Sequence, residues 1–133
     1  MVKILLIEDD KSFIELFREF LDMKYPHVEL RHAGSVDEGI KLYKEMYKNK
    51  KPDIVLIDYN IPGGGGLTLL TKIKEIDPDA KTYILTAHAT QEQTKKSIEA
   101  GAIEVIEKQY EFSKTVDSVV KYLGDESCKS ESK

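Results

Sequence analysis

The sequence predicts an α/β fold in which parallel strands form one sheet with helices packed on both of its faces. Five short apolar runs alternate with segments whose apolar residues recur at helical spacing, which is typical of parallel strands joined by helices. The runs hold mostly branched apolar side chains without a polar face, as strands buried on both sides do. The predicted strands are residues 2–7, 28–32, 53–58, 82–86 and 103–106.

A helical pattern follows each predicted strand, with apolar residues at i, i+3, i+4 and i+7. The first and last helices have the clearest stripes, which are Phe13, Leu16, Phe17, Phe20 and Leu21, and then Val116, Val119, Val120 and Leu123. The second and third helices have Val36, Ile40, Tyr43 and Tyr47, and then Leu67, Leu70 and Ile73. The fourth, residues 90–100, has little apolar surface beyond Ile98.

Capping and breaking residues mark several of these helix ends. Ser35 is a typical N-cap for the second helix, and Gly101 suits the left-handed C-cap of the fourth. Pro26 and Pro78 end the first and third helices, because proline cannot continue a helix. Gly124 is expected to end the last helix.

The length of 133 residues fits one domain with a core of its own. We expect this domain to span residues 1–123 and residues 124–133 to be a polar tail or the start of a linker. Cys128 is the single cysteine, so no disulfide can form within the chain, and we expect an unreactive free thiol.

Charge and hydropathy exclude several classes of protein. A net charge of −4 without a basic stripe argues against direct binding of nucleic acid. The sequence has no apolar run of the length needed for a membrane span and no signal-peptide pattern. We therefore expect a cytoplasmic protein that does not contact the membrane.

Polar residues stand at the ends of four predicted strands, where ligands bind in open parallel sheets. They are Glu8 and Asp9 after the first strand, Asp58 at the end of the third, Thr86 at the end of the fourth and Lys108 after the fifth. If the first and third strands are neighbours, three carboxylates meet in one crevice and repel one another. A bound cation relieves this repulsion, and oxygen ligands of this kind suit Mg²⁺.

The same residues suggest a reaction. A carboxylate can attack phosphorus and form an acyl phosphate, and such transfer depends mainly on positioning and on neutralisation of charge. Mg²⁺ and the ammonium of Lys108 would neutralise charge, and the hydroxyl of Thr86 would donate a directional hydrogen bond.

Four segments, in order, resemble the receiver domain of two-component response regulators. They are residues 4–10 (ILLIEDD), residues 55–62 (VLIDYNIP) with Gly66, residues 84–87 (ILTA), and Gly101-Ala102 followed by Lys108. The resemblance extends from residue 2 to about residue 123. It implies a flavodoxin-like, doubly wound sheet of strand order 2-1-3-4-5 with five helices.

The resemblance also implies roles for individual residues. Asp58 corresponds to the phosphorylated aspartate, and Glu8 and Asp9 correspond to the acidic pair that binds Mg²⁺, with Asp9 as the direct ligand. Asn60 corresponds to the residue whose backbone carbonyl completes the metal site.

Thr86 and Lys108 correspond to the residues that contact the phosphoryl oxygens. In this family the donor is a phosphohistidine on a sensor histidine kinase or a histidine phosphotransfer protein. The output is contact with a downstream protein, usually through the fourth helix, fifth strand and fifth helix. The implied protein is not an enzyme on other substrates and catalyses only its own phosphorylation and dephosphorylation.

Two positions depart from the family pattern. Val105 stands three residues before the lysine, where the family usually has an aromatic residue that rotates as a switch. Gln109 follows the lysine, where the family usually has a cis proline. A cis bond before a non-proline residue costs about 2.5–4 kcal/mol, so we expect a trans bond here.

Other interpretations use the same residues. The acidic run of residues 8–10 could be a solvated helix start, since acids favour helix N-termini. A flavin carrier of the same fold would need a Ser/Thr/Gly-rich loop after the first strand, whereas here that loop opens with three acids, which would repel a phosphate in the absence of a metal. An aspartyl phosphatase would typically need a second Asp where Asn60 stands. A receiver-like docking module that never takes phosphate is the alternative that sequence leaves open.

Overall fold

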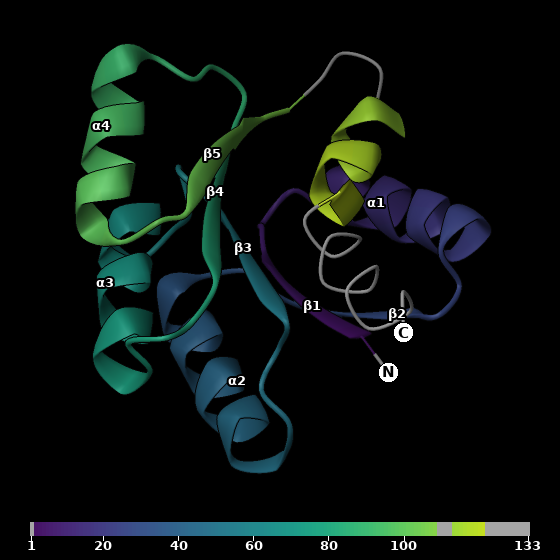
Figure 1. Ribbon diagram of the computed structural model, residues 1–133, viewed down its shortest axis with the longest axis horizontal. Coiled ribbons are helices and arrows are strands. Elements are labelled where there is room, and N and C mark those ends of the chain that lie inside the picture. Colours follow the sequence, from purple (N-terminus) through teal and green to yellow (C-terminus); the bar gives the residue numbers. More distant parts are fainter. Residues whose placement is uncertain (1, 109–112, 122–133) are drawn as a thin grey trace, which may run out of the picture.

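The computed structural model of the chain describes residues 2–108 and 113–121, which form one parallel sheet between two layers of helices (Figure 1). The strand order β2-β1-β3-β4-β5 confirms the predicted fold class and topology. The strands are β1 (Val2–Ile7), β2 (Val28–Ala33), β3 (Ile54–Asp58), β4 (Thr82–Thr86) and β5 (Glu104–Glu107). The helices are α1 (Lys11–Lys24), α2 (Val36–Asn49), α3 (Gly66–Ile76), α4 (Gln91–Ala100) and helical residues 113–121.

The sheet is buried because helices cover both of its faces. Ile4 and Leu6 of β1 pack with α1 and helical residues 113–121, whereas Leu5 and Ile7 pack with α2 and α3. This alternation follows from the two-residue period of a strand. Figure 1 shows α1 on one side of the sheet and α2, α3 and α4 on the other. Burial of each such side chain stabilises the fold by about 1.5–3 kcal/mol.

The caps predicted at Ser35 and Gly101 are present, and Thr90 provides a further cap that was not predicted. The Ser35 hydroxyl accepts a hydrogen bond from the Glu38 amide at 3.2 Å and caps α2. Gly101 ends α4 with a φ of 116°, a left-handed conformation that glycine adopts at little cost. The Thr90 hydroxyl accepts a hydrogen bond from the Gln93 amide at 3.0 Å and caps the start of α4.

Three apolar side chains that the spacing placed on buried helix faces are exposed instead. Leu16, Tyr47 and Ile98 are 41%, 46% and 46% exposed. The buried positions of α1, α2 and α4 include Ile14, Met46 and Ser97. Spacing identifies an apolar stripe, but the neighbours that a helix contacts decide where the centre of its buried face lies.

The last strand begins later than predicted. Ile103 precedes β5 and is 49% exposed, whereas Ile106 within β5 is buried. Helical residues 113–121 bury Val116, Val119 and Val120, as their spacing predicts. The predicted positions Leu123, Gly124 and Cys128, together with the tail 124–133, lie outside the described residues.

Within residues 2–108 and 113–121, no helix combines the length and the apolar character that crossing a bilayer requires.

Candidate functional site

The carboxyl edge of the sheet brings three carboxylates together. β1 and β3 are parallel neighbours with Ile7 opposite Ile57, so the residues that follow Ile7 lie beside Asp58. One carboxylate oxygen from each of Glu8, Asp9 and Asp58 lies within 4.8 Å of the other two. Glu8 and Asp9 are consecutive, whereas Asp58 is far from both in sequence, and the pairing of β1 with β3 makes them neighbours.

Glu8 is a buried acid, with 1% of its surface exposed. Its Oε1 accepts a hydrogen bond from the Lys108 ammonium at 2.7 Å, and its Oε2 accepts one from the Asp10 amide at 3.1 Å. Burial raises the pKa of Glu8 to about 7, against the opposing hydrogen bond from Lys108 and with a further contribution from the charge of Asp58. The site therefore favours a positive charge next to Glu8, which Lys108 supplies.

Asp58 is the last residue of β3 and is 7% exposed. Its Oδ1 accepts a hydrogen bond from the backbone amide of Asn60 at 3.1 Å, and its Oδ2 lies 3.6 Å from the Lys108 ammonium. The structure thus shows a contact of Asn60 that the sequence did not predict. The metal-binding role of the Asn60 carbonyl stays a prediction.

The third acid of the run has a different task. Asp10 Oδ1 accepts hydrogen bonds from the amides of Ser12 and Phe13, at 2.9 and 3.3 Å, and so caps α1. The interpretation of the acidic run as a helix start is therefore correct for Asp10. Glu8 and Asp9 belong to the carboxylate cluster instead.

Lys108 is positioned by its backbone and by an aromatic ring. Its amide donates to the Thr86 carbonyl at 2.8 Å, which extends the β4–β5 pairing by one residue. Its ammonium lies 4.5 Å from the ring centroid of Phe13, a cation–π distance. Sequence reasoning treated Phe13 only as a residue of the α1 stripe, because nothing in the spacing points to Lys108.

The Thr86 hydroxyl is buried and hydrogen-bonded within the segment after β4. It lies 3.2 Å from Oε1 of Gln93 and 3.3 Å from the His88 carbonyl, and it accepts from the His88 amide at 3.3 Å. Within residues 2–108 and 113–121, none of its hydrogen bonds is to Asp58 or Lys108. Sequence analysis missed Gln93, whose position three residues after Thr90 indicates only a capping box.

Gly66 allows α3 to begin against the backbone of the candidate nucleophile. Its amide donates to the Tyr59 carbonyl at 2.9 Å. A Cβ atom at this position would lie 2.5 Å from the carbonyl oxygen of Asp58 and 3.0 Å from the Tyr59 Cα. Only glycine fits here without displacement of the main chain that carries Asp58.

The carboxylate cluster has the donor chemistry of a site for a hard divalent cation. All three side chains offer oxygen atoms, and an oxygen-only set favours Mg²⁺, Ca²⁺ or Mn²⁺ over softer metals. Lys108 compensates only part of the negative charge. The residues present therefore fit a divalent cation.

Comparison with known proteins agrees with this geometry. The family model of the response regulator receiver domain matches residues 4–120. The chain belongs to this family. This receiver domain is 31% identical over 121 residues to the chemotaxis protein CheY of Thermotoga maritima, covering 91% of this chain and 98% of that protein. It is 33% identical over 121 residues to sporulation initiation phosphotransferase F of Bacillus subtilis, covering 91% and 93%.

Solved structures share the receiver fold. A LuxR-family two-component response regulator from Aurantimonas sp. superposes with a TM-score of 0.80 at 27% identity, covering 94% of this chain and 86% of that one. The phosphorylated cyanobacterial phytochrome response regulator RcpA also has a TM-score of 0.80, at 22% identity, covering 91% and 92%. The second likeness supports the fold alone.

Of the two positions that depart from the family pattern, the structure describes Val105 but not Gln109. Val105 of this receiver domain is half-buried and packs against the core on the side of α2 and α3. It carries no polar group, so it cannot form a hydrogen bond through its side chain. Gln109 lies outside the described residues, and the trans bond expected there stays a prediction.

Proposed function

We propose that Asp58 accepts a phosphoryl group from a phosphohistidine in the presence of Mg²⁺, and that the change is passed to a protein partner. One observation carries this proposal. The buried Asp58 carboxylate lies within 4.8 Å of two further carboxylates and 3.6 Å from an ammonium. This arrangement places a nucleophile beside carboxylates that fit a divalent cation and beside an ammonium, and the cation and the ammonium would together neutralise a phosphoryl group.

The transfer exchanges one bond to phosphorus for another. An oxygen of Asp58 forms a bond to phosphorus while the bond from phosphorus to the imidazole nitrogen of the donor breaks. The imidazole leaves with the electron pair and takes up a proton, and an acyl phosphate remains on Asp58. Lys108 stabilises the transferred group with its positive charge, and Thr86 can donate a hydrogen bond to one phosphoryl oxygen.

Glu8, Asp9 and Asp58, with the backbone carbonyl of Asn60, would hold the Mg²⁺ ion. When bound, Mg²⁺ neutralises negative charge on the phosphoryl oxygens. Asp9 suits the role of direct ligand, because it is exposed and has no hydrogen-bond or ion-pair partner in the described part of the chain. Glu8 Oε1, in contrast, is bonded to Lys108.

A sensor histidine kinase or a histidine phosphotransfer protein is the proposed phosphoryl donor. The similarity to a protein named sporulation initiation phosphotransferase F supports a place in such a relay. A downstream protein is the proposed receiver of the signal. The activity would be limited to phosphorylation and dephosphorylation of Asp58 itself. The cytoplasmic location and the domain limits of 1–123 stay predictions.

The test is to incubate the whole chain with acetyl phosphate as phosphoryl donor in the presence of Mg²⁺, and then to measure its mass by mass spectrometry. The wild-type chain should gain the mass of one phosphoryl group, and Asp58→Asn should gain none because its amide is not a nucleophile. Asp22→Asn, a change at an exposed acid of α1, is the matched control and should react normally. Chelation of Mg²⁺ should stop the reaction. A wild-type chain that gains no mass would support a docking module instead.

A further inference from the structure

We infer that Gln93 is a positioning residue that holds the Thr86 hydroxyl away from Asp58 until a phosphoryl group on Asp58 competes for that hydroxyl. The inference rests on the proposed phosphorylation of Asp58. Gln93 lies at the start of α4, so its contact with Thr86 would couple phosphorylation of Asp58 to that helix.

The hydroxyl of Thr86 cannot serve both sites at once. It is buried, and its single proton is shared between Oε1 of Gln93 at 3.2 Å and the His88 carbonyl at 3.3 Å. A hydroxyl has one donor and accepts with its lone pairs. Donation to a phosphoryl oxygen therefore requires that the hydrogen bond to Gln93 break.

The side chain of Gln93 is diverted from its ordinary role in a helix cap. The sequence from Thr90 to Gln93 has the capping-box spacing, in which each residue of the pair bonds the backbone of the other. Thr90 does so, because its hydroxyl accepts a hydrogen bond from the backbone amide of Gln93 at 3.0 Å. The side-chain oxygen Oε1 of Gln93 instead faces the Thr86 hydroxyl, which lies outside the helix.

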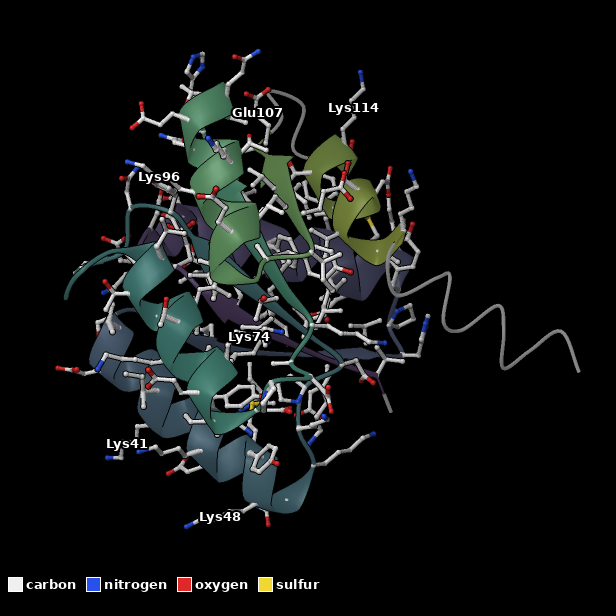
Figure 2. All side chains as sticks on the ribbon, turned by 60° about the vertical axis from the view of Figure 1, so that its left-hand side comes forward. Lys41, Lys48, Lys74, Lys96, Glu107 and Lys114 are labelled. Atoms are coloured by element: carbon white, nitrogen blue, oxygen red, sulfur yellow. The ribbon has the colours of Figure 1, made fainter. Side chains whose placement is uncertain are left out.

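The start of α4 depends on such polar contacts because the helix has little apolar burial. Ser97 is the buried residue of α4, and Ile98 is 46% exposed. A second contact comes from β5, where the Glu107 carboxylate accepts from the Ala89 amide at 2.9 Å. Figure 2 shows Glu107 beside the upper end of α4. Segments with few apolar contacts open readily, so loss of one hydrogen bond here changes local stability.

The phosphoryl group is the stronger competitor. A hydrogen bond to a charged acceptor is about twice as strong as one to a neutral amide oxygen. The Thr86 hydroxyl should therefore leave Gln93 when Asp58 is phosphorylated. Val105, the residue of β5 paired with Ile84, is apolar and cannot take over as the partner of Gln93. The first turn of α4 then loses its contact with β4.

The experiment compares four full-length chains, which are wild type, Gln93→Ala, Gln93→Glu and Gln91→Ala. Gln91 is an exposed residue of the same helical turn and serves as the matched control. Glutamate keeps an oxygen acceptor at position 93, so Gln93→Glu should retain the contact. Hydrogen exchange at the amides of residues 88–94 is measured with and without Mg²⁺ and beryllofluoride, a stable phosphoryl analogue. The rate of phosphorylation by acetyl phosphate is measured by mass.

In wild type and in Gln91→Ala, the analogue should speed exchange at residues 88–94 several-fold. In Gln93→Glu, exchange before the analogue is added should be as slow as in wild type, and the analogue should speed it less, because the carboxylate is a charged acceptor that competes with the phosphoryl analogue for the Thr86 hydroxyl. Gln93→Ala should exchange faster before the analogue is added and change little afterwards. It should also gain its phosphoryl group about 2- to 10-fold faster, the effect expected from one hydrogen bond.

The outcomes separate the two proposals. If wild type is phosphorylated but Gln93→Ala matches it in rate and in exchange, the role of Gln93 is refuted and the phosphoacceptor function stands. If Gln93→Glu behaves like Gln93→Ala, Gln93 is not an acceptor for Thr86 and the inference also fails. If no chain gains a phosphoryl group or responds to the analogue, both proposals fail.

Discussion

Three groups converge on the ammonium of Lys108. The Glu8 carboxylate lies 2.7 Å away, the Asp58 carboxylate 3.6 Å away and the ring centroid of Phe13 4.5 Å away. The two carboxylates attract the ammonium, and the negative face of the ring restricts its remaining freedom. Phe13 therefore helps to position Lys108 in a chain that lacks the proline usual after this lysine.

We predict that Phe13→Leu slows phosphorylation by acetyl phosphate about 2- to 5-fold, because a cation–π contact contributes about 0.5–1 kcal/mol. Leucine keeps most of the apolar volume, so the cost in stability should stay near 1–1.5 kcal/mol, roughly that of a shape change in a core. Phe17→Leu is the control, since Phe17 stacks on Phe13 and is buried in the same core. Equal phosphorylation rates in the two variants would contradict the prediction.

The connection from β3 to α3 shows how an element positions the nucleophile. Asp58 ends the strand, the Asn60 amide bonds its carboxylate, and the Gly66 amide returns to the Tyr59 carbonyl at 2.9 Å. The first turn of α3 therefore packs directly on the backbone of Asp58. A main chain cannot yield as a flexible side chain can, so this contact requires glycine.

Gly66→Ala should lower the free energy of unfolding by about 1–3 kcal/mol, the usual cost of overpacking. It should also slow phosphorylation, because its Cβ would lie 2.5 Å from the Asp58 carbonyl oxygen and displace that residue. Gly34→Ala is the control: its nearest contact would be the Glu38 carboxylate at 3.4 Å. Urea unfolding and the phosphorylation assay check both effects. A Gly66→Ala chain as stable and reactive as Gly34→Ala would refute the close approach.

At the scale of the whole molecule, a third buried acid joins elements that lie outside the site. Asp77 follows α3 and accepts hydrogen bonds at 3.0 Å from Tyr43 of α2, from Lys51 and from the Asp79 amide. Burial acts to raise the pKa of Asp77, but the hydrogen bonds from Lys51, Asp79 and Tyr43 outweigh it and hold the pKa below its ordinary value of 3.8. Asp77 therefore stabilises the fold in its charged form.

The lowered pKa of Asp77 predicts a pH dependence of stability. Because the folded chain binds the proton less readily, the stabilisation is fully present above the ordinary pKa of 3.8 and is lost as the pH falls toward the lowered value. Asp77→Asn should lower the free energy of unfolding by about 1–3 kcal/mol at pH 7. Its free energy of unfolding should also fall less than that of wild type as the pH is lowered. Urea unfolding from pH 7 to pH 2 measures this. Asp79→Asn, at an exposed side chain, is the control, and parallel curves for wild type and Asp77→Asn would contradict the prediction.

The sequence anticipated the fold and the set of strand-end residues because both depend on local patterns. Apolar runs identified the strands, helical stripes identified the helices other than α4, and Ser35 and Gly101 were predicted caps that the structure contains. Acids and a lysine at strand ends indicated a site, because parallel strands end at the same edge. The errors at Leu16, Tyr47 and Ile98 arose because periodicity does not specify which neighbours a helix contacts.

The sequence by itself determined the alternation of strands and helices, the helix caps and the family, since these follow from backbone preferences and short motifs. Only the tertiary structure decided the partners of the polar groups at the site. Glu8 and Lys108 are 100 residues apart and yet paired, and Gln93 bonds Thr86 instead of its own cap. Such choices depend on distances of a few ångströms between side chains on different elements, and only packing of the whole chain sets those distances.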